Sequence, residues 1–240
     1  MSSSGLDFPD IAAVYARFAA LTAMSSSLGG ALVLFTGLDR DGIALATASN
    51  IAGAASLGLE SDVTRAKNAL RGGVCDFVVN SLDEALRILK NEIRKGLPVS
   101  VILTGEVSAH IAEIVTRGVQ PEIIAFAAPA LINRGARLLA ISEENTQEPV
   151  QWSVASEPMR WLPVVDTLAI RSLEDADARI RWIEGSPRYL GRAFAGQRFV
   201  RMSGAELEAF IEALRSAVKT GAIPAAISIS RGGKLISISP

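Results

Sequence analysis

Short apolar runs alternate with segments of helical periodicity from Ala31 onward. The apolar runs predict strands over residues 31–35, 56–60, 75–79, 99–103 and 123–127. Parallel strands need long crossover connections, which are usually helices. The alternation therefore indicates an α/β fold with a doubly wound, mostly parallel Rossmann-like sheet.

Several predicted helices carry start and stop signals. Ser81 with Glu84 has the pattern of a capping box, in which a serine and a glutamate satisfy the free amides of a helix start. Gly96 suits the end of the same helix. Ser203 with Glu206 repeats the capping-box pattern and predicts a helix that extends to residue 219.

The pattern differs on either side of the predicted sheet. Apolar positions at helical spacing over residues 10–24 predict a helix that docks on the main domain. Residues 142–149 are polar and acidic and end in Pro149, which indicates a linker or an exposed loop. The expected organisation is an N-terminal docking helix within residues 1–27, a Rossmann-like domain at 28–142 and a smaller C-terminal α/β region at 150–240.

The C-terminal region has mixed patterns. We expect an extended segment at 161–170 and a helix at 173–184. At residues 226–239, isoleucines alternate with serines on both sides of Gly232-Gly233, which predicts a hairpin in a half-buried sheet.

Composition excludes several classes of protein. Hydrophobic residues make up 49% and charged residues 20%, as expected of a globular chain. Twenty-four basic and 25 acidic residues leave a net charge of -1, which argues against partners such as nucleic acid or an anionic membrane. The single cysteine cannot form a disulfide within the chain. One histidine and one cysteine cannot supply a tetrahedral zinc site by themselves. The N-terminus has no basic leader, so we expect a cytoplasmic protein.

Parallel sheets of this kind bind ligands where their strands end. In the turn after the first strand, glycines would let a pyrophosphate approach the helix amino end. Glu60 ends the second strand, where an acid can bind a ribose hydroxyl. The expected cofactor-binding residues follow these strand ends: Thr36, Gly37, Arg40, Gly42, Glu60, Thr104 and Gly105.

The middle of this turn opposes a cofactor phosphate. Asp39 and Asp41 bring carboxylates to the place where a pyrophosphate would lie, and Arg40 compensates only part of their charge. The alternative interpretation is an ordinary strand-to-helix turn with solvated charges.

Four other residues are candidates for chemistry or for structural roles. His110 stands near a helix start at the ligand edge, as a general acid or base or as a structural residue. Arg134 and Arg137 follow the fifth strand, where they would bind an anion or remain solvated. Cys75 opens an apolar strand and is interpreted as a small core residue.

Several segments resemble the NAD-binding domain of urocanase (urocanate hydratase). They are residues 34–38, the alanine-rich helix, 57–62, 81–85, 95–106 and 115–122, within a resemblance that covers residues 28–137. The resemblance implies a domain in which tightly bound NAD acts as an electrophile toward an imidazole substrate. It assigns Gly37 and Gly42 to the phosphate loop and Glu60 to the ribose.

The chain also departs from that family. Its loop has fewer glycines, and residues 126–131 retain none of the polar groups that the family has there. Hydratase activity is therefore not carried over. Three hypotheses remain: a homo-oligomeric binding domain for a dinucleotide (NAD), a nucleotide or a small anionic ligand; a non-catalytic assembly protein with a decayed site; and an NAD-dependent lyase that uses His110 and Arg134.

Overall fold

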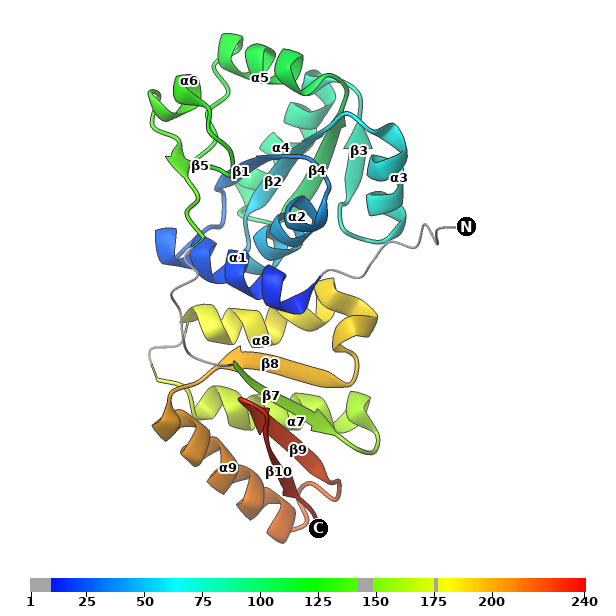
Figure 1. Ribbon diagram of the computed structural model, residues 1–240, viewed down its shortest axis with the longest axis vertical. Helices are drawn as coiled ribbons and strands as arrows, with labels where there is room; N and C mark the ends of the chain where they lie inside the picture. Colours follow the sequence, from blue (N-terminus) through cyan, green and yellow to red (C-terminus); the bar gives the residue numbers. More distant parts are fainter. Residues whose placement is uncertain (1–9, 142–148, 175–176) are drawn as a thin grey trace. The chain divides into compact units, whose positions relative to one another are not determined.

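The computed structural model describes residues 10–141, 149–174 and 177–240. The chain forms two compact units, Met1–Ser142 and Glu143–Pro240 (Figure 1). Each unit has its own sheet and its own buried side chains. Within the described ranges, no helix combines the length and the apolar character needed to cross a membrane.

A parallel sheet forms the centre of the N-terminal unit. Its strands are β1 (Leu32–Thr36), β2 (Ala55–Glu60), β3 (Phe77–Val79), β4 (Val99–Thr104), β5 (Ile123–Ile124) and β6 (Arg137–Leu138). They lie in the order β3-β4-β2-β1-β5-β6, and all neighbouring strands are parallel. This topology confirms the doubly wound, Rossmann-like α/β sheet that the sequence predicts.

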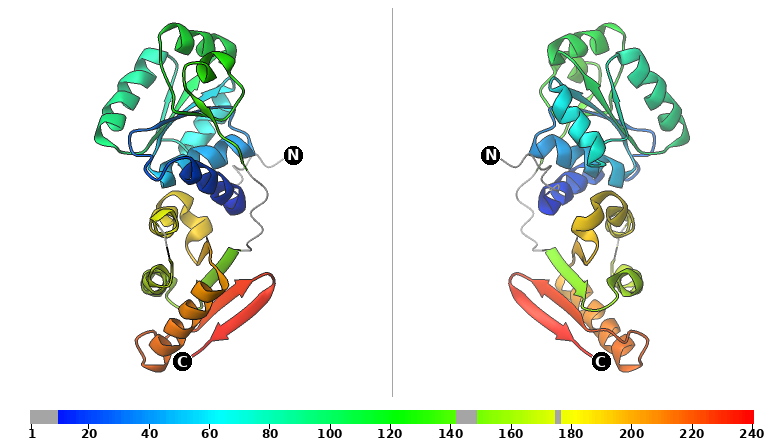
Figure 2. Two further views of the ribbon diagram at one scale, coloured as in Figure 1. Left: turned by 90° about the vertical axis from the view of Figure 1, so that its left-hand side faces the viewer. Right: turned by 90° about the vertical axis from the view of Figure 1, so that its right-hand side faces the viewer.

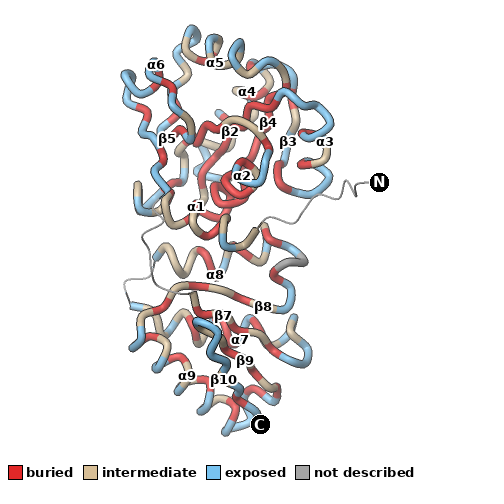
Figure 3. The backbone as a smooth tube through the Cα atoms, in the orientation of Figure 1, coloured by how far each residue is buried: buried red, intermediate tan, exposed pale blue. Residues whose placement is uncertain are grey.

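Helices cover both faces of this sheet (Figure 2). They are α1 (Ile11–Met24), α2 (Arg40–Ala52), α3 (Val63–Arg71), α4 (Leu82–Lys95), α5 (Val107–Thr116) and the short α6 (Pro129–Ile132). Buried leucines of β1, β2 and β4 form one core with residues of α4 and α5. Strands β2 and β4 are buried throughout (Figure 3). Helix α2 has three fully buried alanines, Ala44, Ala46 and Ala48. Their small side chains allow α2 to lie close to its neighbours, among them α1.

The strand predicted over residues 123–127 is shorter in the structure. Only Ile123 and Ile124 pair with a neighbouring strand, β1 on one side and β6 on the other. The apolar run continues because Ala128 and Leu131, in and beside α6, still contribute to the core. Ala125 and Ala127 are exposed, so the apolar run is longer here than the paired, buried strand.

The C-terminal unit contains a four-stranded antiparallel sheet. Its strands are β7 (Pro149–Val154), β8 (Gln197–Arg201), β9 (Ile227–Arg231) and β10 (Lys234–Ile238), in the order β10-β9-β7-β8. Its helices are α7 (Pro158–Arg171), α8 (Asp177–Leu190), the 3-10 helix η1 (Gly191–Phe194) and α9 (Gly204–Lys219). Gly232 and Gly233 have φ of 55° and 75°, and they close the β9–β10 hairpin as predicted.

The extended segment predicted at 161–170 is wrong, because these residues belong to α7. Leu162, Val165 and Ala169 are buried at the three- and four-residue spacing of a helix face. Pro163 lies inside this helix and removes one backbone N–H donor, but the burial of one apolar face holds the segment helical. The next helix begins at Asp177, later than predicted.

Asp166 of α7 is the centre of a buried cluster of polar side chains in this unit. Its Oδ1 accepts a hydrogen bond from Trp152 Nε1 at 3.0 Å, and its Oδ2 accepts one from Arg198 Nε at 2.9 Å. The side chains of Arg198 and Asp166 are only 8% and 12% exposed. A paired arrangement is required here, because an isolated charge would be costly to bury.

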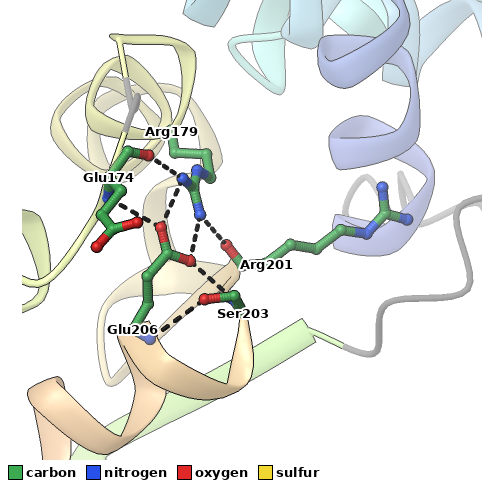
Figure 4. Close-up of polar contacts among 5 residues, drawn as sticks. All are labelled: Glu174, Arg179, Arg201, Ser203 and Glu206. Carbon is green, nitrogen blue, oxygen red and sulfur yellow. Dashed lines mark hydrogen bonds and ion pairs between the residues drawn. The ribbon is translucent and has the colours of Figure 1, made fainter.

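Glu206 of α9 is the centre of a second polar cluster (Figure 4). Its carboxylate oxygens accept hydrogen bonds from both Nη atoms of Arg179, at 2.7 and 2.8 Å, and from the backbone N–H groups of Glu174 and Ser203. Ser203 Oγ accepts from Glu206 N, which completes the predicted capping box. Burial raises the pKa of Glu206, but these bonds outweigh it and lower the pKa to about 2.

Acid is expected to weaken the C-terminal unit through Glu206. Its pKa is near 4.5 ordinarily and about 2 in the folded chain, so its stabilising contribution is complete above pH 4.5 and declines as the pH falls toward 2. Linkage predicts a loss of about 1.4 kcal/mol between pH 7 and pH 3.5. Urea unfolding of the wild type and of Glu206→Gln at both pH values should show their stability difference shrinking by that amount. An unchanged difference would contradict the assignment.

Candidate functional site

Three neighbouring strands end at one edge of the N-terminal sheet. Gly37 N donates to Leu59 O at 2.8 Å, and Gly105 N donates to Glu60 O at 3.1 Å. The ends of β1, β2 and β4 are therefore joined directly by backbone hydrogen bonds. The structure brings the following predicted residues to this edge: Thr36, Gly37, Gly42, Glu60, Thr104 and Gly105.

The two loop glycines are required by the turn itself. Gly37 has a φ of 77°, in the left-handed region that favours glycine. A Cβ on Gly42 would lie 2.0 Å from the carbonyl oxygen of Gly37. The loop backbone at Gly37 therefore lies close to Gly42 in the first turn of α2. This contact explains both glycines without a bound phosphate.

Asp39 occupies the amino end of α2. It is the N-cap residue, and its Oδ1 accepts hydrogen bonds from Asp41 N at 3.1 Å and Gly42 N at 2.9 Å. In dinucleotide-binding folds the amides at this helix start meet a phosphate. Here a carboxylate of the chain itself takes two of them.

Glu60 is directed toward backbone rather than toward solvent. It is 3% exposed, its Oε2 accepts from Leu38 N at 2.7 Å, and its Oε1 accepts from Asp62 N at 2.8 Å. Leu38 itself is 2% exposed. Glu60 therefore fixes the loop conformation, and little of its carboxylate is left for a ribose hydroxyl.

A crevice opens beside this loop, between the ends of β1 and β5. Its volume is about 250 Å³, and its lining includes Arg17, Phe35, Thr36, Asp39, Asp41 and Leu139. This is the point at which the strand order reverses, where open α/β sheets bind ligands.

Sequence reasoning missed Arg17. This side chain lies on the buried side of α1 and its Nη2 is 2.6 Å from Asp41 Oδ1. The available signal was a charged residue within the apolar stripe of the predicted helix, next to Phe18. Helix α1 is thus part of the crevice wall as well as a neighbour of α2.

Arg40 and His110 have local partners. Arg40 pairs with Asp10 at the start of α1, and its side chain is 73% exposed. His110 Nε2 is 3.2 Å from Thr104 O, and a Cβ on Gly105 would lie 2.6 Å from the same nitrogen. The His110 ring thus packs against the backbone of Thr104 and Gly105 at the end of β4. This contact gives both the histidine and the glycine a structural role.

Two predicted anion-binding residues lie away from the loop. Arg137 opens β6 opposite Ile123, the first residue of β5, and its Nη1 donates to Met24 O at 2.8 Å. Arg134 Nη1 donates to Val115 O, in the last turn of α5, at 2.5 Å. Both contacts are at the amino end of the sheet, opposite the candidate crevice.

Cys75 has the character of a core residue. It is buried, and burial, aided by the nearby charge of Asp76, raises the pKa of its thiol to about 12. Across the described parts of the chain, no cluster of three or more His, Cys, Asp or Glu side chains is arranged to hold a metal ion.

Comparison with known proteins gives a family match for part of the chain. Among solved structures, an O-methyltransferase from Bacillus cereus in complex with SAH matches at 14% identity, with a TM-score of 0.32, over 78% of this chain and 71% of its own. A likeness at that score says nothing about what this chain binds. Residues 12–130 match the family model of the urocanase Rossmann-like domain, from within α1 to α6. The N-terminal unit therefore contains a urocanase-like Rossmann domain.

Proposed function

We propose that the N-terminal unit is a binding domain for a compact ligand of about nucleoside size, and that it does not hydrate urocanate. The observation that carries this proposal is the Asp39 carboxylate on the amides of Asp41 and Gly42. The unit has the fold of a dinucleotide-binding domain, but its own Asp39 carboxylate accepts hydrogen bonds from two amides that would otherwise bind a phosphate.

The residues present do not fit NAD. A pyrophosphate would have to displace Asp39 from α2 and would then face the charge of Asp41 as well. The ribose-binding position is held by Glu60, which is bonded to Leu38 N and Asp62 N. The crevice, at about 250 Å³, lies just under the range of about 300–1,000 Å³ that is usual for ligand pockets, so its size suits a compact ligand and not a dinucleotide.

The same residues suit a neutral nucleoside. Phe35 and Leu139 offer apolar surface to a base, and Arg17 lies in the same wall. Among the residues that the structure describes, no group donates a hydrogen bond to Asp39 Oδ2, and Asp39 is exposed. Ribose hydroxyls are donors that this oxygen can accept.

Calorimetric titration with adenosine, AMP and NAD tests the proposal. We expect adenosine to bind at least about tenfold more tightly than AMP, because the phosphate of AMP, with about two negative charges near pH 7, faces Asp39 and Asp41. NAD should give no signal at millimolar concentration. Asp39→Ala should improve AMP binding, because it frees two amides and removes a charge.

A matched control is available in the same unit. Asp62 caps α3 in the same way, with Oδ1 accepting from Thr64 N and Arg65 N, so Asp62→Ala removes an equivalent cap without changing the crevice. It should leave the order of the three affinities unchanged. Tight NAD binding by the wild type would refute the proposal. Failure of all three ligands would favour a non-catalytic assembly protein, expected to be a homo-oligomer.

A further inference from the structure

A cavity of the C-terminal unit lies between α7, α8 and η1. Its volume is about 700 Å³, within the range of small-molecule sites. Much of its wall is apolar, including Met159, Pro163, Ile170, Ile183, Pro187 and Phe194. The described residues that line it all belong to this one unit.

A partly used guanidinium lines this cavity. Arg198 Nε donates to Asp166, and its Nη1 donates to Phe194 O at 2.5 Å and Gln197 O at 3.0 Å. Within the described residues, Arg198 Nη2 has no hydrogen-bond partner. This atom is not fully buried, so part of its surface is accessible. Its N–H groups are thus available to a molecule in the cavity.

The charges of the wall favour a neutral occupant. Asp166 and Arg198 compensate each other, and Glu184 adds a negative charge. An anionic ligand would be repelled by Glu184, and a cation would find the Asp166 oxygens already bonded to Trp152 and Arg198. A neutral acceptor, such as a carbonyl oxygen, matches Arg198 Nη2, a donor of the wall that has no partner among the described residues.

We propose that this cavity is a second binding site, for a neutral and mostly apolar small molecule with one hydrogen-bond acceptor that pairs with Arg198 Nη2. The apolar body of the ligand would contact Ile170, Ile183 and Phe194. The site is separate from the crevice of the N-terminal unit and does not depend on what that crevice binds.

The fluorescent ketone prodan tests this site, since it is neutral, apolar and carries one carbonyl acceptor. We expect a blue-shifted emission that saturates at one prodan per chain. Thr167→Trp, which places a large side chain into the cavity from an exposed position on α7, should weaken binding at least tenfold. Val164→Trp is the matched control, because Val164 is 40% exposed on the same helix but does not line the cavity, and it should bind like the wild type.

A second probe tests the acceptor. 2-(Dimethylamino)naphthalene lacks the carbonyl and should bind about fivefold more weakly, as expected for the loss of one hydrogen bond. Equal binding of prodan by Thr167→Trp and the wild type, or no saturable shift, would overturn the proposal. Binding that strengthens on dilution of the protein would also overturn it, since a second copy of the chain would then be the natural occupant. Adenosine should not displace prodan.

Discussion

Replacing Asp166 with alanine is expected to lower the free energy of unfolding of the C-terminal unit by about 3–5 kcal/mol. The change leaves Arg198 buried without a counter-charge and removes the acceptor of Trp152 Nε1. Burial raises the pKa of Asp166 even though Arg198 and Trp152 oppose it, which shows how strongly this position is desolvated. Urea unfolding followed by tryptophan fluorescence measures the effect, because Trp152 is fully buried beside the pair.

Two companion variants separate charge burial from other effects. Glu208→Ala removes an exposed carboxylate of the same unit and should change stability by no more than about 0.5 kcal/mol. Asp166→Ala combined with Arg198→Met removes both charges and should be more stable than Asp166→Ala alone. A double variant that is weaker than the single one would show that the ion pair is not the source of the loss.

Gly42→Ala is expected to destabilise the N-terminal unit by about 3 kcal/mol, at the upper end of overpacking costs. The added methyl would lie 2.0 Å from Gly37 O and 2.9 Å from Gly37 C, so backbone must move at the start of α2. Gly204→Ala is the control, because a Cβ there meets nothing within 4 Å.

Hydrogen exchange followed by mass spectrometry is the appropriate measurement for Gly42→Ala. The chain has three tryptophans, Trp152, Trp161 and Trp182, and all lie in the C-terminal unit, so their fluorescence does not report on α2. Protection of β1 and α2 should fall while that of β7 and β8 is unchanged. Equal protection in the variant and the wild type would contradict the close contact between the loop and α2.

The fold of the N-terminal unit could be predicted because its signals are local and repeated. Each buried strand is followed by a helical segment, and a parallel sheet is the arrangement that this order allows. The Ser203–Glu206 capping box and the Gly232-Gly233 hairpin were also set by neighbouring residues. The extended prediction for residues 161–170 is wrong because the apolar residues of one helix face resemble those of a strand until their burial is known.

The candidate site was predicted only as far as topology determines it. The order of the strands placed Glu60 and the 36–42 turn at one edge, but it could not show that Glu60 bonds to Leu38 N or that Asp39 bonds to the amides of α2. Arg134 was assigned from its position after the fifth strand. Because β5 is short and the chain returns to begin a parallel β6, Arg134 contacts Val115 at the other edge.

Native mass spectrometry of the freshly purified chain tests the central claim most directly, namely that the urocanase-like domain does not bind NAD because Asp39 caps its phosphate position. We predict no mass increment matching NAD, before or after NAD is added, and one adenosine per chain when adenosine is supplied. The same spectrum reports the number of subunits. A retained increment of one NAD per chain would contradict the account.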